Sequence, residues 1–180
     1  MIQARNLKKE YDEFALDVPE FSLAKGEITA LVGENGAGKT TLIRCLTNII
    51  RDYSGEIQVD GRIYTGTQQD LTAKIAYMSE DIRLMEDLRV RDHLDLARGL
   101  ALSWDENECR RLLEILKVKT GVKVKELSRG NRVKLGIILA LARRPEILIL
   151  DEPTSGLDPI IRELVLGEIK RQKESGTAVL

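Results

Sequence analysis

The chain of 180 residues is poor in cysteine, histidine and aromatic side chains: it has 2 cysteines, 1 histidine and 4% aromatic residues. Cys45 and Cys109 lie far apart and no Cys-x-x-Cys motif occurs, so we expect reduced thiols and no zinc site. No apolar run approaches the length of a membrane span, and the sequence does not open with the pattern of a leader peptide. These absences predict a soluble, cytoplasmic chain.

An excess of charge of one sign is also lacking, because 28 basic and 29 acidic residues leave a net charge of −1. A protein that binds nucleic acid through its total charge is therefore not expected. Basic residues gather in residues 110–144, where 11 basic and 2 acidic residues give a net charge of +9. Two interpretations remain open: a solvated face of helices, which we favour, or an anion-binding site.

The hydrophobic patterns of the first 80 residues are typical of β-strands. We expect strands over residues 14–23, 27–32 and 75–78. Asp60-Gly61 is a strong hairpin signal between residues 57–59 and 62–64.

Helical periodicity begins near residue 89. The pattern at residues 103–106 predicts a cap at Ser103, and Ser128 is expected to cap a helix that reaches Ala142. A buried strand at residues 147–150, a helix opened by Asp158-Pro159 and a strand from Thr177 follow. Alternating strands and helices predict an α/β fold with a mostly parallel sheet, N-terminal antiparallel strands and a helical subdomain inserted at about residues 80–140.

Residues 33–40 match the phosphate-binding P-loop pattern G-x-x-x-x-G-K-[ST]. Its glycines allow backbone N–H groups to converge on phosphates, and the N-terminus of the following helix adds a positive dipole. Lys39 can reach the β- and γ-phosphates, and the Thr40 hydroxyl can ligate Mg²⁺. The predicted nucleotide contacts are Gly33, Glu34, Asn35, Gly36, Ala37, Gly38, Lys39, Thr40 and Thr41.

Two carboxylates follow the apolar strand at residues 147–150. Asp151 is expected to hold Mg²⁺, and Glu152 is placed to polarise an attacking water molecule. An Asp-Glu pair alone is a weak signal, but a P-loop upstream makes it a strong one.

Between these motifs lies Leu127-Ser128-Arg129-Gly130-Asn131, which is similar to a known signature, LSGGQ. Residues 152–158 resemble the segment that leads into the D-loop in the proteins that carry this signature. On these motifs the chain resembles the nucleotide-binding subunit of an ATP-binding-cassette (ABC) transporter from Tyr11 to Leu180. The resemblance implies one ABC ATPase domain over residues 1–180, with a P-loop NTPase core.

The resemblance also implies further contacts with ATP. Ser128 and Gly130 would contact the γ-phosphate of ATP held by a partner subunit, and Asp158 would meet the partner's P-loop. Tyr11 stands where the family places an aromatic side chain that stacks on adenine, with Phe14 as the alternative.

Three features depart from the family pattern. Arg129 and Asn131 replace signature residues, and Glu80 replaces a glutamine after the strand at residues 75–78. Glu80 can still ligate Mg²⁺, but it cannot donate a hydrogen bond as an amide does. The chain also stops at Leu180, before the histidine and the C-terminal part that the family carries, so the resemblance implies a C-terminally short chain.

By resemblance, the chain is an ATPase subunit that uses Mg²⁺ and works as a homodimer or heterodimer. It would power a separate transmembrane permease from the cytoplasmic face of the membrane, with no nucleic-acid partner. Trp104-Asp105 and the LSRGN signature favour export. The alternatives are a chain that binds ATP without hydrolysing it, and a soluble ABC ATPase outside transport.

Overall fold

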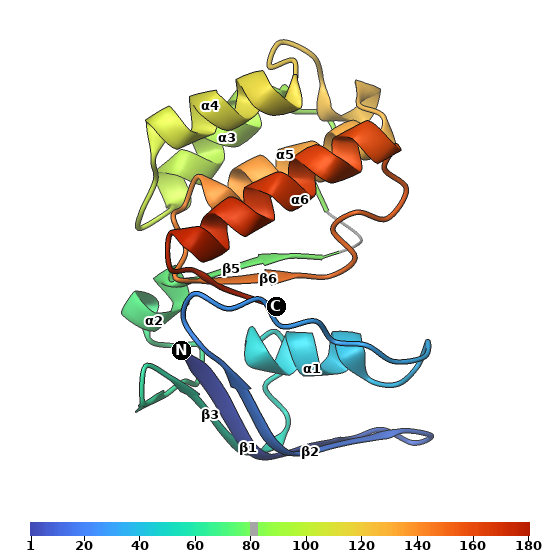
Figure 1. The fold of residues 1–180 in the computed structure, drawn as a ribbon, viewed down its shortest axis with the longest axis vertical. Helices are drawn as coiled ribbons and strands as arrows, with labels where there is room; N and C mark the ends of the chain where they lie inside the picture. The colour runs from blue at the N-terminus through green and yellow to red at the C-terminus, as the bar shows by residue number, and fades with distance from the viewer. Residues whose placement is uncertain (80–82) are drawn as a thin grey trace. The chain divides into compact units, whose positions relative to one another are not determined.

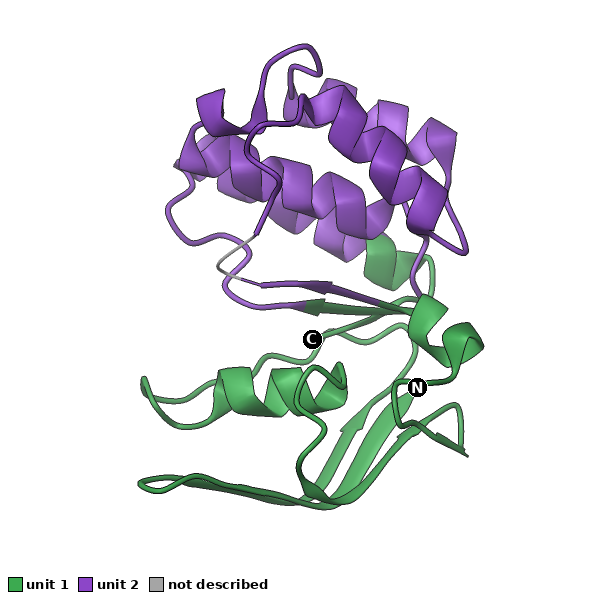
Figure 2. Ribbon diagram, turned by 180° about the vertical axis from the view of Figure 1, so that it is seen from behind, with its two compact units in different colours: residues 1–75, 146–149, 172–180 green, residues 76–145, 150–171 purple. Residues whose placement is uncertain are grey.

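The computed structural model describes residues 1–79 and 83–180 (Figure 1). These residues divide into two compact units (Figure 2). Unit 1 comprises residues 1–75, 146–149 and 172–180, and unit 2 comprises residues 76–145 and 150–171. The division passes through two strands, β5 (Ile75–Met78) and β6 (Ile147–Leu150). Among the described residues, no helix is both long and apolar enough to cross a membrane.

Unit 1 begins with an antiparallel sheet of order β2-β1-β3-β4. Its strands are β1 (Ile2–Glu10), β2 (Ala15–Leu23), β3 (Ser54–Val59) and β4 (Arg62–Ile63). The predicted hairpin is confirmed, because Asp60 and Gly61 have φ angles of 49° and 75°, and Val59 pairs with Arg62. Positive φ at both central residues is what a type I′ turn requires.

The rest of unit 1 contains α1 (Lys39–Leu46), α2 (Gln69–Ala73) and β7 (Ala178–Val179). β7 pairs in parallel with β6 and forms one parallel bridge to Ile28. The expected strand over residues 27–32 is wrong, since only Ile28 pairs and Val32 is 93% exposed. Among the described residues, Val179 pairs with this segment, through hydrogen bonds from Val179 N to Glu27 O and from Thr29 N to Val179 O, both 2.8 Å long, and one bridge of this kind does not make a strand.

Unit 2 is mainly helical (Figure 1). Its helices are α3 (Val90–Leu100), α4 (Glu106–Leu116), the 3₁₀ turn η1 (Val124–Glu126), α5 (Arg129–Leu141) and α6 (Pro159–Glu174), of which residues up to 171 belong to this unit. α5 contacts both α3 and α4. Apolar residues are buried on several sides of α5, including Val133, Leu135, Ile137 and Ile138. A helix buried in this way is the core of its unit.

The helix caps agree with the sequence in two cases and differ in one. Ser128 caps α5, and Asp158 Oδ1 accepts a hydrogen bond from Ile161 N at 3.1 Å, so both predicted helix starts are confirmed. The cap expected at Ser103 is wrong. Asp105 caps α4 instead, because its carboxylate accepts hydrogen bonds from the Asn107 and Glu108 amides at 2.8 and 3.0 Å.

A network of two buried carboxylates and two arginines joins α4 to α6. Glu108 and Glu168 are only 9% and 7% exposed. Arg111 donates to both, at 2.9 Å for Nε to Glu108 Oε2 and 2.9 Å for Nη1 to Glu168 Oε1, and Arg171 also pairs with both. Burial alone raises the pKa of Glu168, but hydrogen bonds from Arg111 and Arg171 outweigh it and leave the pKa lowered.

Replacing one member of this network should destabilise the fold. We expect Glu168→Ala to lower the free energy of unfolding by about 3 kcal/mol, because it leaves two arginines without one of their two buried partners. Urea denaturation measures the loss. Glu163→Ala, at an exposed position of the same helix, is the matched control and should change little.

The pH dependence has a defined sign. Since the folded-state pKa of Glu168 is lowered, its contribution is present above the unfolded pKa of about 4.3 and is lost as pH falls through the folded value. The difference between the native chain and Glu168→Ala should therefore shrink below about pH 4. An equal loss of stability in Glu168→Ala and Glu163→Ala at neutral pH would contradict the stabilising role of the network.

Candidate nucleotide-binding site

The P-loop of unit 1 is an exposed loop that ends at the first residue of α1. Gly36 and Gly38 have φ angles of 85° and 91°, a left-handed conformation that a side chain would strain. Ala37 N donates to Glu34 O at 3.2 Å. The loop therefore enters α1 by tight turns, and the positive end of the α1 dipole lies at the loop, where it favours an anion.

Lys39 folds back onto the loop that precedes it. Its Nζ donates to Gly33 O at 2.7 Å and to Glu34 O at 2.9 Å. The ammonium group thus lies at the loop itself, close to the backbone that would surround a phosphate. Thr40 and Thr41 follow it in the first turn of α1.

An aromatic pair lies against the P-loop within unit 1. Phe14 is the direct neighbour, because a Cβ built on Gly38 would be only 2.6 Å from Phe14 Cζ. The Tyr11 ring stacks on Phe14 with a centroid separation of 6.3 Å and an interplanar angle of 29°, and Lys9 Nζ lies 5.0 Å from the Tyr11 centroid. Tyr11 is 48% exposed, so it forms the outer, accessible ring of the pair.

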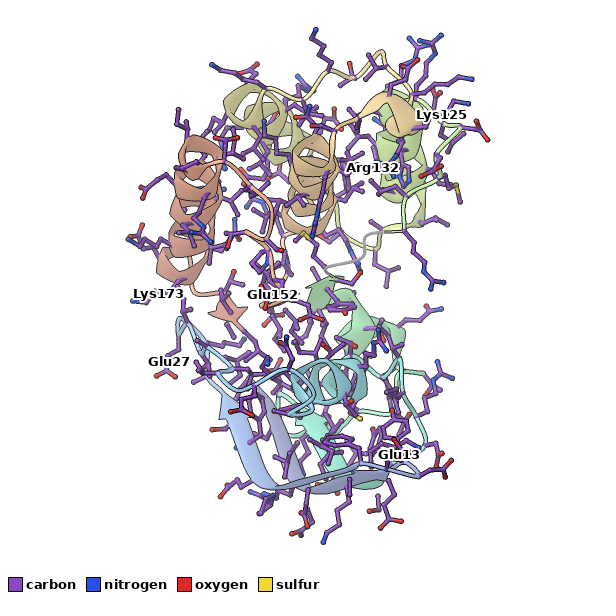
Figure 3. All side chains as sticks on the ribbon, turned by 90° about the vertical axis from the view of Figure 1, so that its right-hand side faces the viewer. Glu13, Glu27, Lys125, Arg132, Glu152 and Lys173 are labelled. Atoms are coloured by element: carbon purple, nitrogen blue, oxygen red, sulfur yellow. The ribbon has the colours of Figure 1, made fainter. Side chains whose placement is uncertain are left out.

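The two predicted carboxylates lie at the end of β6 in unit 2. Asp151 N donates to Met78 O at 2.9 Å, which places the ends of β5 and β6 side by side. Glu152, labelled in Figure 3, has a φ of 53°, which is uncommon for a residue other than glycine. A turn follows directly, with Ser155 N donating to Glu152 O at 3.1 Å.

The signature segment and the turn after Glu152 are in contact, although they lie far apart in the sequence. Ser128 Oγ accepts a hydrogen bond from Asn131 N at 3.3 Å. A Cβ on Gly130 would lie 3.5 Å from Leu157 Cδ2. The segment that ends at Asp158, the cap of α6, therefore packs against the N-terminus of α5.

The predicted site residues fall into two sets. Tyr11 and residues 33–41 belong to unit 1, and Ser128, Gly130, Asp151, Glu152 and Asp158 belong to unit 2. Glu80 lies outside the described residues.

The side chains expected to hold Mg²⁺ offer the oxygen atoms that this ion prefers. Among residues 1–79 and 83–180, no group of three or more His, Cys, Asp or Glu side chains could hold a metal by itself. In magnesium sites of nucleotide enzymes, one or two protein oxygens act together with phosphate oxygens. The Thr40 hydroxyl and the Asp151 carboxylate fit that chemistry.

Sequence reasoning did not identify a pocket of about 510 Å³ in unit 2, between the end of β5, α3 and α5. Apolar side chains of α3, among them Leu96 and Leu100, line it, together with the polar side chains of Arg83, His93 and Arg143. Burial lowers the pKa of Arg143, which forms no ion pair with any described residue. The apolar face of α3 is the feature of the sequence that could have indicated this pocket. The spacing of its apolar residues, however, equally fits a helix that packs on a core.

The ABC transporter family model matches residues 16–155 of the chain. An ABC transporter ATP-binding protein of Methanosarcina mazei is 34% identical over 188 residues, which cover 100% of this chain and 38% of the relative. Another, from Methanocaldococcus jannaschii, is 37% identical over 185 residues, which cover 99% of this chain and 66% of the relative. The chain thus spans less than two thirds of either relative.

The comparison with solved structures gives the same family. The structure of an ATP-binding subunit of an ABC transporter matches 99% of this chain and 77% of its own, with a TM-score of 0.88 and 29% identity. The predicted α/β fold, with antiparallel N-terminal strands and a parallel sheet, is confirmed. The chain therefore belongs to the ABC transporter family and has the fold of its ATP-binding subunits.

Proposed function

We propose that the chain binds and hydrolyses ATP to power transport through a separate transmembrane subunit. The observation that carries this proposal is the P-loop, where Lys39 Nζ bonds to the loop carbonyls of Gly33 and Glu34 at the N-terminus of α1. The chain would act as one ABC ATPase domain over residues 1–180, with a helical subdomain at about residues 80–140. This organisation is compatible with a mainly helical unit 2.

In this proposal, residues 33–41 bind the phosphates through backbone N–H groups, the helix dipole and the Lys39 ammonium. Tyr11 stacks on adenine. Its exposure and its position on Phe14, which lies against Gly38, support that role. An aromatic face accepts any purine, so the choice of ATP over GTP rests on the family.

Hydrolysis needs an activated water molecule and a means of neutralising phosphate charge. Mg²⁺, when bound, supplies that neutralisation, and Thr40, Asp151 and Glu80 are the residues that would hold it. Glu152 would accept the proton of the attacking water as general base. Its left-handed backbone conformation supports a functional role, because such conformations concentrate at active sites.

A second ABC ATPase subunit, identical or different, would complete the site. Ser128 and Gly130 would bind the γ-phosphate held by that subunit, and Asp158 would contact its P-loop. The N-terminus of α5 supports this assignment: Ser128 is its cap, α5 has 13 residues, and no acidic residue occurs in its first turn.

We place the docking site of the transmembrane subunit at the pocket between β5, α3 and α5, on the cytoplasmic face of the membrane. Its apolar lining includes Leu100 and Met85, both exposed, and Arg143 adds a positive charge without an ion-pair partner among the described residues. The matching partner is a short apolar segment that carries a carboxylate.

We favour export as the direction, on the LSRGN signature and Trp104-Asp105. The names of relatives do not decide the direction: one match is a methionine import protein of Rhizobium etli, and another is a linearmycin resistance protein of Bacillus subtilis. ATP binding without hydrolysis is the alternative function.

The first test is steady-state hydrolysis of Mg·ATP by the full chain beside two variants. Glu152→Gln should lower turnover at least about 100-fold, because an amide cannot accept the proton of water. Lys39→Ala should abolish ATP binding itself, measured with a fluorescent ATP analogue. Turnover that survives in Glu152→Gln would contradict the proposed general base, and an unchanged ATP affinity in Lys39→Ala would contradict the P-loop assignment.

Docking is tested by co-purification with the transmembrane subunit. Arg143→Glu should reduce the amount recovered about tenfold or more, because it places a negative charge opposite the expected carboxylate. Arg91→Glu, the same substitution on the exposed side of α3, should not. ATP hydrolysis by the isolated chain should be equal in both variants. Equal recovery of the partner by Arg143→Glu and Arg91→Glu would overturn the docking site.

A further inference from the structure

Arg129 reaches from the signature segment to the turn that follows the two carboxylates. It is the first residue of α5, at a position where the family signature has glycine. Its Nη2 donates to Ser155 Oγ at 3.4 Å. Both residues belong to unit 2, so this contact lies inside one compact body.

The conformation of Gly156 makes room for the arginine. Gly156 has a φ of 69°, and a Cβ there would lie 3.3 Å from Arg129 Nε and 3.4 Å from its Cζ. The guanidinium therefore lies against the backbone of the turn, where any larger residue would press on it. Next to it, Gly130 packs on Leu157, so two consecutive signature residues contact three consecutive residues of the turn.

The turn that Arg129 contacts is short and tightly bonded. Ser155 N donates to Glu152 O at 3.1 Å, and Leu157 N donates to Thr154 O at 3.3 Å. Glu152 forms one end of the turn, and Asp158 at the other end caps α6. The contact of Arg129 in the middle of the turn therefore restrains both Glu152 and Asp158.

We propose that Arg129 is a positioning residue that holds the turn of residues 152–158, and through it the Glu152 carboxylate, in its working conformation. This inference rests on the proposed function of Glu152. It differs from a role of Arg129 in attracting the partner's triphosphate, because a positioning residue acts on the rate of the chemical step rather than on the affinity for ATP.

The experiment compares Arg129→Ala, Ser155→Ala and the double variant in the full chain. Each single variant should lower kcat for ATP hydrolysis about fivefold and leave KM unchanged, as expected for one lost hydrogen bond. The double variant should fall no further, because both changes remove the same interaction. Lys125→Ala is the matched control, because it also removes a positive charge a few residues before α5. Lys125 pairs with Asp87 at 2.9 Å and lies away from Glu152 and its turn (Figure 3).

Two kinetic results would overturn the proposal. One is a raised KM with unchanged kcat in Arg129→Ala, which would assign the arginine to nucleotide attraction. The other is native turnover in Ser155→Ala.

Hydrogen exchange gives a readout that does not depend on catalysis. Without nucleotide, the amide of Leu157 should exchange faster in Arg129→Ala and in Ser155→Ala, and at the native rate in Lys125→Ala and Glu152→Gln. Native exchange at Leu157 in Arg129→Ala would overturn the proposal. Turnover that persists in Glu152→Gln, with exchange accelerated in Arg129→Ala, would instead overturn the proposed function and leave the contact in place.

Discussion

The burial of β6 along its whole length is the constraint on which the site depends. Its four apolar residues are all buried, and both of its sides are paired: with β5, to which Asp151 N is bonded through Met78 O, and with β7. A strand fixed in this way cannot slip in register without exposing apolar side chains. Asp151 and Glu152, which follow the strand, therefore have defined positions at its carboxyl end.

Charge in unit 2 is organised by pairing. Several basic residues of the segment 110–144 meet acidic residues from elsewhere: Lys125 with Asp87, Arg132 with Glu86, Arg144 with Asp105, and Arg111 with Glu108 and Glu168. Exposed pairs of this kind contribute little to stability, whereas the buried network of α4 and α6 constrains geometry. The pairing supports the interpretation of this segment as a helix face, and Arg129 in addition contacts the Ser155 hydroxyl and Gly156.

Elements with a strong local signal could be predicted from the sequence. The apolar run of β6, the Asp60-Gly61 turn and the Ser128 and Asp158 caps depend on neighbours within a few residues, and the structure confirms all four. The strand expected over residues 27–32 is wrong because a strand needs a partner along its length, and among the described residues this segment forms one bridge, from Ile28 to Val179. Asp105 and not Ser103 caps α4, because the Asp105 carboxylate accepts hydrogen bonds from the Asn107 and Glu108 amides, a choice that the pattern at residues 103–106 does not reveal.

The sequence by itself determined the family, the P-loop and the pair of carboxylates, since each is a spacing of residue types whose chemistry is local. Only the tertiary structure decided which distant residues meet: Glu108 with Glu168 through two arginines, and Arg129 with Ser155 and Gly156. It also decided that Phe14 lies on Gly38 with Tyr11 outside it. Such contacts depend on how helices and turns pack in three dimensions, and no periodicity along the chain records that packing.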